Sequence, residues 1–124
     1  MKRIALACDD HFGLESSLSA HFGRCPFYIF VDISKDSILD FQLVDNPYLQ
    51  NHQPGMIPRF INSQKANVMI CGGMGPRAMD LFREFDIEVV SGVRGKVKEV
   101  LEAYLRGEVR GVIPCEHSNH KCEE

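Results

Sequence analysis

The chain has 124 residues, of which 44% are hydrophobic and 25% charged, and these values are ordinary for a single soluble globular domain. Its formal net charge of −3 gives no long-range field to attract a phosphate backbone, so we expect no nucleic-acid partner. The sequence starts with a charged pair and a short strand, and it has no apolar run near the roughly 18 residues of a membrane span. We therefore expect a cytoplasmic protein without membrane contact.

The first half of the chain predicts three strands. Residues 3–8 form a continuous apolar run that ends at Asp9 and Asp10, which is typical of a central strand buried on both faces. Residues 27–31 and 38–44 are rich in β-branched and aromatic side chains, and the polar segment 34–37 joins them. So short a connection predicts an antiparallel hairpin.

The second half alternates helices with strands. The predicted order is a helix from residue 56, a strand at 68–71, a helix opened by Pro76, a strand at 87–90 and a helix at 97–105 that ends at Gly107. In the second of these helices we expect Met79, Phe82 and Phe85 to face inward. In the third, apolar residues recur at i, i+3, i+4, i+7 and i+8, which predicts one buried face.

Such alternation implies parallel pairing through right-handed crossovers, beside an antiparallel hairpin. The most economical fold is a single α/β domain with a mixed five-stranded sheet of ribonuclease H-like topology, in the order 3-2-1-4-5, with strand 2 antiparallel and helices flanking it. We assign this domain to residues 1–113. Loops 9–26, 72–76 and 91–95 then share the carboxyl edge of the sheet, where open α/β sheets bind ligands.

The turn 20–27 at that edge carries an imidazole, a guanidinium and a thiol, from His21, Arg24 and Cys25. Cys and His ligate iron and zinc, and a neighbouring Arg compensates thiolate or sulfide charge. The alternative interpretation is structural, with Cys25 buried as a small apolar side chain and His21 bonded to the backbone. The candidate ligand-binding residues at the shared edge are His21, Arg24, Cys25, Gly73, Met74, Arg77 and Arg94.

The glycine-rich turn from Gly72 to Arg77 follows a strand and opens a helix, so its N–H groups and the positive helix end suit an anion. The GxxxxGK[ST] pattern of a P-loop is absent. An anionic cluster or a phosphate would fit the turn, and an ordinary strand-to-helix connection explains the glycines equally well.

Five cysteines stand at positions 8, 25, 71, 115 and 122, an odd number without the density of a disulfide scaffold, so we expect free thiols. Residues 114–124 form a separate tail with two thiols and two imidazoles. Zinc accepts this set of ligands, and a disordered polar tail is the alternative. The candidate zinc ligands are Cys115, His117, His120 and Cys122.

Three segments carry a family resemblance: the opening strand 2–8, His21-Phe-Gly-Arg-Cys25 and Cys71-Gly-Gly-Met-Gly-Pro-Arg77. In order and spacing they resemble the dinitrogenase iron-molybdenum cofactor biosynthesis family, over roughly residues 1–113. That family includes nitrogenase accessory proteins, which carry the cofactor or its iron-sulfur precursor, and small stand-alone relatives. The resemblance implies the ribonuclease H-like fold. The tail is familiar only in some stand-alone relatives, so the chain looks like a small stand-alone, nitrogenase accessory factor-like member.

We therefore expect a carrier protein that binds an iron-sulfur cluster or iron-molybdenum cofactor precursor and exchanges it with a metallocluster donor or acceptor protein. The alternative is an anion- or nucleotide-binding module that uses the Gly72–Arg77 turn. We expect no enzyme, because the core strands lack the carboxylates of a two-metal nuclease and no Ser/His/Asp series is recognisable. Since His21 and Cys25 leave coordination sites unfilled, a homodimer, the tail or an exogenous ligand would complete the set.

Overall fold

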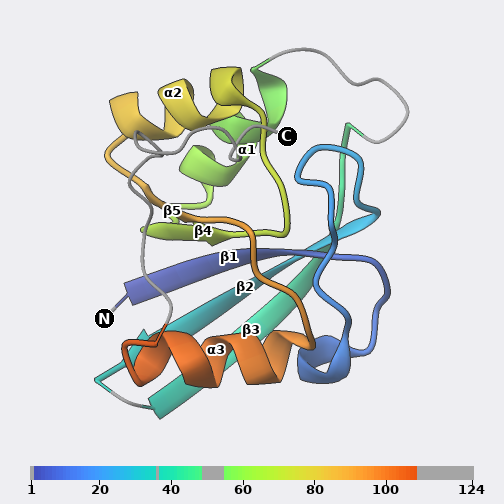
Figure 1. The fold of residues 1–124 in the computed structure, drawn as a ribbon, viewed down its shortest axis with the longest axis vertical. Helices are drawn as coiled ribbons and strands as arrows, with labels where there is room; N and C mark the ends of the chain where they lie inside the picture. Colours follow the sequence, from blue (N-terminus) through green and yellow to red (C-terminus); the bar gives the residue numbers. More distant parts are fainter. Residues whose placement is uncertain (1, 36, 49–54, 109–124) are drawn as a thin grey trace.

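A computed structural model describes residues 2–35, 37–48 and 55–108 of the chain. One sheet has the order β3-β2-β1-β4-β5, with β2 antiparallel to its two neighbours and β4 parallel to both β1 and β5 (Figure 1). The predicted order and strand directions are thus confirmed, and they agree with a ribonuclease H-like arrangement. The elements are β1 (Lys2–Cys8), the 3-10 turn η1 (Gly13–Glu15), β2 (Phe27–Ser34), β3 (Ser37–Asp45), α1 (Met56–Ser63), β4 (Val68–Ile70), α2 (Pro76–Glu84), β5 (Glu88–Val90) and α3 (Val97–Leu105).

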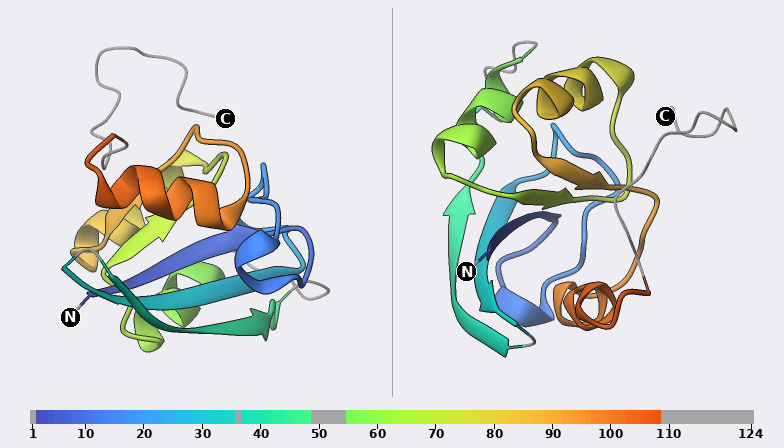
Figure 2. Two further views of the ribbon diagram at one scale, coloured as in Figure 1. Left: turned by 90° about the horizontal axis from the view of Figure 1, so that it is seen from below. Right: turned by 90° about the vertical axis from the view of Figure 1, so that its left-hand side faces the viewer.

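The sheet separates two apolar layers. Helices α1 and α2 cover one face and α3 covers the other (Figures 1 and 2). Residues 4–8 of β1 are fully buried, and successive side chains enter opposite layers because a strand alternates between its faces. The continuous apolar run at 3–8 is therefore explained by a central strand that is covered on both sides.

The helices bury the faces that their periodicity predicts. In α2, Phe82 is fully buried, and Met79 and Phe85 pack half-buried against the same layer. In α3, Val97, Val100 and Leu101 are buried in the opposite layer, and Tyr104 and Leu105 pack beside them. Pro76 occupies the first turn of α2, where its fixed φ and missing N–H are tolerated.

The long connection between β1 and β2 is more regular than its composition indicates. It contains η1 and forms two isolated antiparallel bridges, Cys8 with Leu18 and Ser17 with Lys96. Ser16 is buried there, and its Oγ accepts a hydrogen bond from the Phe12 N–H at 2.9 Å. Sequence periodicity could not show this order, because it depends on backbone partners far along the chain.

The tail at 114–124, with its four candidate zinc ligands, lies outside the described residues, as does the predicted domain boundary at residue 113. These two assignments stay predictions. Among the residues that the structure describes, no helix is long and apolar enough to cross a bilayer.

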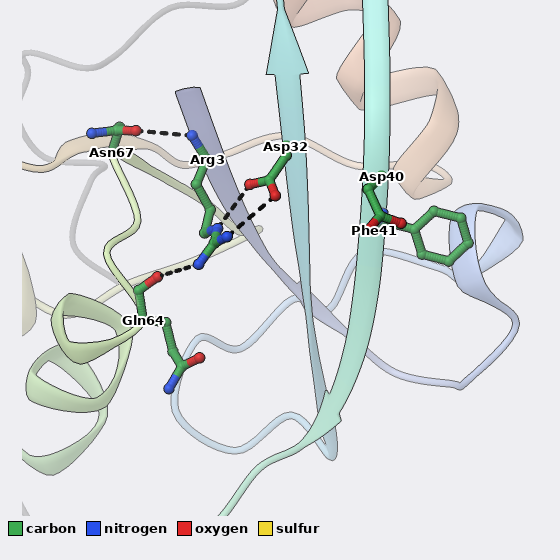
Figure 3. Close-up of polar contacts among 6 residues, drawn as sticks. All are labelled: Arg3, Asp32, Asp40, Phe41, Gln64 and Asn67. Carbon is green, nitrogen blue, oxygen red and sulfur yellow. Dashed lines mark hydrogen bonds and ion pairs between the residues drawn. The ribbon is translucent and has the colours of Figure 1, made fainter. Parts of the chain in front are cut away.

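An ion pair holds the amino-terminal half of the sheet to α1 (Figure 3). Arg3 of β1 donates to both carboxylate oxygens of Asp32 on β2, at 2.8 and 3.2 Å, and its remaining nitrogen donates to the Gln64 carbonyl after α1 at 2.8 Å. The guanidinium lowers the pKa of the Asp32 carboxyl through this hydrogen bond. Since both side chains are only partly exposed, this pair is screened less than an ordinary surface pair.

We expect Arg3→Gln to lower the free energy of unfolding by about 1 kcal/mol, measured by urea denaturation at pH 7. The lowered pKa of Asp32 means that the contribution is present above its ordinary pKa of 3.8 and is lost as the pH falls below it. The matched control is Arg83→Gln, whose exposed pair with Asp80 should contribute less than about 0.5 kcal/mol. Equal effects of the two substitutions would contradict this prediction.

Candidate functional site

Three loops at the carboxyl edge of the sheet are joined by backbone hydrogen bonds, on the right-hand side of Figure 1. Segment 16–22 is bonded to both of the other loops, which are also bonded to each other because the Gly92 N–H donates to Gly72 O at 3.0 Å. On one side, the Gly72 N–H donates to Ser19 O at 2.9 Å and the Phe22 N–H donates to Gly73 O at 3.1 Å. On the other, the Leu18 N–H donates to Gly95 O at 2.9 Å. The shared edge predicted from the strand order is thus one continuous backbone surface.

Two glycines permit this contact. A Cβ at Gly72 would lie 2.8 Å from both Ser19 O and Ala20 Cα, and a Cβ at Gly73 would lie 2.9 Å from Ala20 O. Real Cβ atoms do not approach backbone so closely, so these positions need glycine for the packing of one loop on another. The Gly72 N–H is also bonded to the neighbouring loop, so it is not free to bind an anion.

Cys25 lies beneath this surface and is 1% exposed. Its thiol is 3.3 Å from Phe27 O and 3.6 Å from Phe22 O, and the Tyr28 hydroxyl donates to the same Phe22 O at 2.6 Å. Asn46 donates its side-chain amide to Cys25 O at 2.8 Å. Sequence reasoning missed this role of Asn46, because only the fold brings its amide to that carbonyl.

Two further buried cysteines lie at the same edge, and sequence reasoning did not place them in the site. Cys71, which follows β4, belongs to the same apolar layer as Cys25, whereas Cys8, the last residue of β1, belongs to the opposite layer. Burial raises the pKa of all three thiols, to about 11 for Cys25 and about 12 for Cys71. Hydrogen bonding to Tyr28 offsets only part of this rise at Cys25. The thiols are therefore protonated at neutral pH.

The charged candidates lie outside, on the surface. His21, Arg24, Arg77 and Arg94 are all exposed. Within the described part of the chain, none of the three guanidinium groups forms an ion pair or a hydrogen bond. We call Arg24, Arg77 and Arg94 the cationic rim. Arg24 and Arg94 belong to two of the three bonded loops, and Arg77 lies in the first turn of α2, directly after the third loop.

The two remaining candidates, Met74 and Gly73, contribute to packing. Met74 is 3% exposed and belongs to the apolar layer under α1 and α2, and Gly73 lies against Ala20. Among residues 2–35, 37–48 and 55–108, no three His, Cys, Asp or Glu side chains are grouped so that they could hold a metal ion. The structure thus brings His21 and Cys25 to one edge, with the imidazole outside and the thiol inside, without assembling a ligand set.

Fold and site together define a small α/β domain of the open mixed-sheet class, with a cation-lined carboxyl edge. Residues 1–107 match the family described as "Dinitrogenase iron-molybdenum cofactor", and the chain belongs to this family. The resemblance seen in the three sequence motifs is thereby confirmed.

Individual proteins are similar to the chain over most of its length. The structure of PH0822 is 32% identical, with a TM-score of 0.79, and the match covers 89% of this chain and 94% of that one. The uncharacterised protein MJ0580 of Methanocaldococcus jannaschii is 26% identical over 112 residues, which are 88% of this chain and 90% of the relative. The apo form of the orange protein from Desulfovibrio gigas, at 24% identity and a TM-score of 0.78, covers 90% of this chain and 93% of its own and shows likeness of fold alone.

The loop contact makes a prediction about glycine. Gly72→Ala should lower the free energy of unfolding by about 1–3 kcal/mol, because the new methyl group collides with backbone atoms, which cannot move away by a change of rotamer. Gly75→Ala is the control, since a Cβ there meets nothing within 4 Å. Urea denaturation measures both effects, and equal stability of the two variants would show that segment 16–22 does not pack on Gly72 in solution.

Cys25 should react slowly with alkylating reagents. A rise in its pKa from 9.0 to about 11 reduces the thiolate fraction at pH 8 by about 100-fold, and burial slows the reaction further. Alkylation by iodoacetamide, followed by mass spectrometry of the Cys25 peptide, should therefore be at least about 100-fold slower in the native protein than in urea. Comparable rates in the two states would mean that the thiol is not buried in solution.

Proposed function

We propose that the protein binds an anionic metal-sulfur cluster, an iron-sulfur cluster or an iron-molybdenum cofactor precursor, at the carboxyl edge of the sheet and carries it to an acceptor protein. The observation that supports this most strongly is the cationic rim, with two exposed arginines on loops that are bonded to one another and the third, Arg77, in the first turn of α2. Membership of a family named for the iron-molybdenum cofactor supports the class of cargo.

Charge explains why such a rim suits such a cargo. Metal-sulfur clusters with thiolate or sulfide ligands are anionic, and arginine presents several N–H donors in a planar fork to an anion. The three guanidinium groups have no other partner in the described structure, so no existing ion pair must break before they bind. The first turn of α2, which contains Arg77, adds the positive end of a helix.

The arrangement favours carriage over catalysis. The described residues offer no group of three His, Cys, Asp or Glu side chains that could ligate a metal ion. A cluster that the cationic rim holds by charge therefore keeps the ligands with which it arrives. Such a cargo can leave with few bonds broken. His21 is the exposed side chain best placed to ligate it directly, and Cys25 can do so only after segment 20–26 moves and the thiol loses its proton.

The second candidate, an anion- or nucleotide-binding module, uses the same rim with phosphate as ligand. The Gly72 N–H does not favour it, because that donor is bonded to Ser19 O. Thermal-shift measurements with inorganic phosphate and ADP separate the two candidates. Stabilisation by either ligand, together with failure to retain iron and sulfide, would replace the cluster proposal with this one.

The test is anaerobic reconstitution with iron and sulfide, read as visible absorbance and as iron and sulfide retained per chain after gel filtration. Arg24→Gln, Arg77→Gln and Arg94→Gln combined should reduce retention about tenfold or more, since three exposed charges each contribute up to about 1 kcal/mol. The matched control combines Lys65→Gln, Arg83→Gln and Arg106→Gln, which remove the same charge from the opposite ends of the helices.

Two further variants separate the rim from other sulfur ligands. His21→Ala with Cys25→Ser tests direct ligation at the edge. Cys115→Ser with Cys122→Ser removes the thiols of the tail from the full chain. If the tail variant loses iron while the rim variant retains it, the cluster binds at the tail and the proposed site is wrong. Equal retention by the rim variant and its matched control would also reject the proposal.

A further inference from the structure

The buried side-chain amide of Asn46 fixes the backbone of the turn that carries Arg24. Its nitrogen donates to Gly23 O at 3.2 Å and to Cys25 O at 2.8 Å, while its oxygen accepts a hydrogen bond from the Tyr48 N–H at 2.8 Å. Both N–H bonds and the oxygen of the amide are therefore occupied, which fixes its orientation. Since Asn46 is only 6% exposed, it holds the turn from the interior.

The Tyr28 hydroxyl holds the same turn at a second point. It donates to Phe22 O at 2.6 Å, and the Tyr28 side chain is wholly buried. The carbonyl groups of Phe22 and Gly23, which are neighbours in the chain, are thus both bonded to donors in the interior. Backbone acceptors are in this way kept away from the solvent side of the turn.

The planar peptide bond then sets the direction of the next two N–H groups. In a trans peptide the N–H points opposite to the C=O of the same unit, and the described residues contain no cis peptide. The Gly23 N–H is therefore directed away from Tyr28, and the Arg24 N–H is directed away from Asn46. Among the described residues, neither N–H has a hydrogen-bond acceptor.

Successive backbone N–H groups that face away from the interior are a recurrent means of binding anions in proteins. Here they lie beside the Arg24 guanidinium, which is exposed and has no ion pair or hydrogen bond in the described structure. A planar guanidinium and two amides offer hydrogen-bond donors only. This face of the turn therefore suits an anion and does not suit a cation.

We propose that the Gly23 and Arg24 N–H groups bind an anion together with the Arg24 guanidinium, and that Asn46 is the positioning residue that keeps these donors directed outward. For the identity of the ligand, this inference rests on the proposed function. Backbone amides donate to the sulfur atoms of protein-bound metal-sulfur clusters, and such hydrogen bonds stabilise their negative charge. The site itself requires only an anion of suitable size.

Amide chemical shifts test the site in the full chain without any cluster. The isotopically labelled protein is titrated with sodium sulfate at pH 7, with sodium chloride at equal ionic strength as the reference. The Gly23 and Arg24 N–H resonances should shift to saturation in sulfate alone, while the amide resonances of β1 stay unchanged. Absence of a saturable shift at both residues, or the same shift in chloride, would mean that water alone solvates these amides and would overturn the proposal.

Asn46→Ala tests the positioning role. Without its two side-chain hydrogen bonds the turn can rotate, so the dissociation constant for sulfate should rise about tenfold. Asn67→Ala is the matched control, since it removes an amide beside Arg3 at the opposite end of the sheet, and it should leave sulfate binding unchanged. Equal dissociation constants for the wild-type protein and folded Asn46→Ala would reject the positioning role.

Tyr28→Phe provides a second variant if Asn46→Ala does not fold. It removes the donor to Phe22 O and keeps the aromatic ring, so it should weaken sulfate binding by releasing the peptide that carries the Gly23 N–H. Circular dichroism checks that each variant is folded. Unchanged sulfate binding by folded Tyr28→Phe would contradict the inferred orientation of that peptide.

Reconstitution with iron and sulfide separates this inference from the proposed function. If the wild-type protein binds sulfate at Gly23 and Arg24 but retains no iron, the anion site stands and the cluster proposal fails. If the wild-type protein and Asn46→Ala retain iron equally, the cluster proposal stands and these backbone donors are not its binding site.

Discussion

The contact between two stretches of backbone, at Gly72 and Gly73 on one side and Ser19 and Ala20 on the other, governs the arrangement of this edge of the molecule. Both glycines lie so close to the facing loop that a methyl group would not fit. The hydrogen bonds beside them fix segment 16–22 across the ends of β1 and β4. The positions of Cys25 and Arg24 depend on this contact, because the same loop buries the thiol and leads into Arg24.

The loop therefore divides the chemistry of the edge into an inner and an outer part. Inside are three thiols whose pKa values are raised by burial, together with the Tyr28 hydroxyl. Outside are an imidazole and three guanidinium groups in contact with solvent. An anionic ligand that approaches from solvent meets the cations first. Any sulfur-metal bond to Cys25 would require the loop to move and the thiol to lose its proton.

Much of the fold could be predicted from local patterns, because those patterns follow directly from burial. The apolar run at 3–8 indicated a central strand, and the periodic residues of α2 and α3 indicated their buried faces. The strand order followed from connection lengths and crossover handedness. The carboxyl edge and the loops that share it followed from that order, so the location of the candidate site was accessible from the sequence.

The interior of the site was less accessible. Cys71 was counted as a free thiol and not placed in the same apolar layer as Cys25, although the strand order puts it at the carboxyl edge, beside the end of β1. His21 and Cys25 are four residues apart in an irregular turn, where no periodicity tells which side chain is buried. The amide of Asn46 is bonded across more than twenty residues, and only the folded chain shows such a partner.

Strand β1 and segment 16–22 are held in the fold in different ways. This strand pairs antiparallel with β2 along its whole length and parallel with β4 at residues 4–6, and five of its residues are wholly buried. Segment 16–22, in contrast, belongs to no ladder of the sheet: backbone hydrogen bonds to the neighbouring loops and the end of β1 hold it, and Leu18 and Phe22 anchor it in the two apolar layers. Its detachment leaves the ladders of β1 with β2 and β4 intact, so it requires less free energy than global unfolding. Amide hydrogen exchange in that segment can therefore proceed by a local opening event, whereas exchange of the β1 amides requires unfolding of the whole domain.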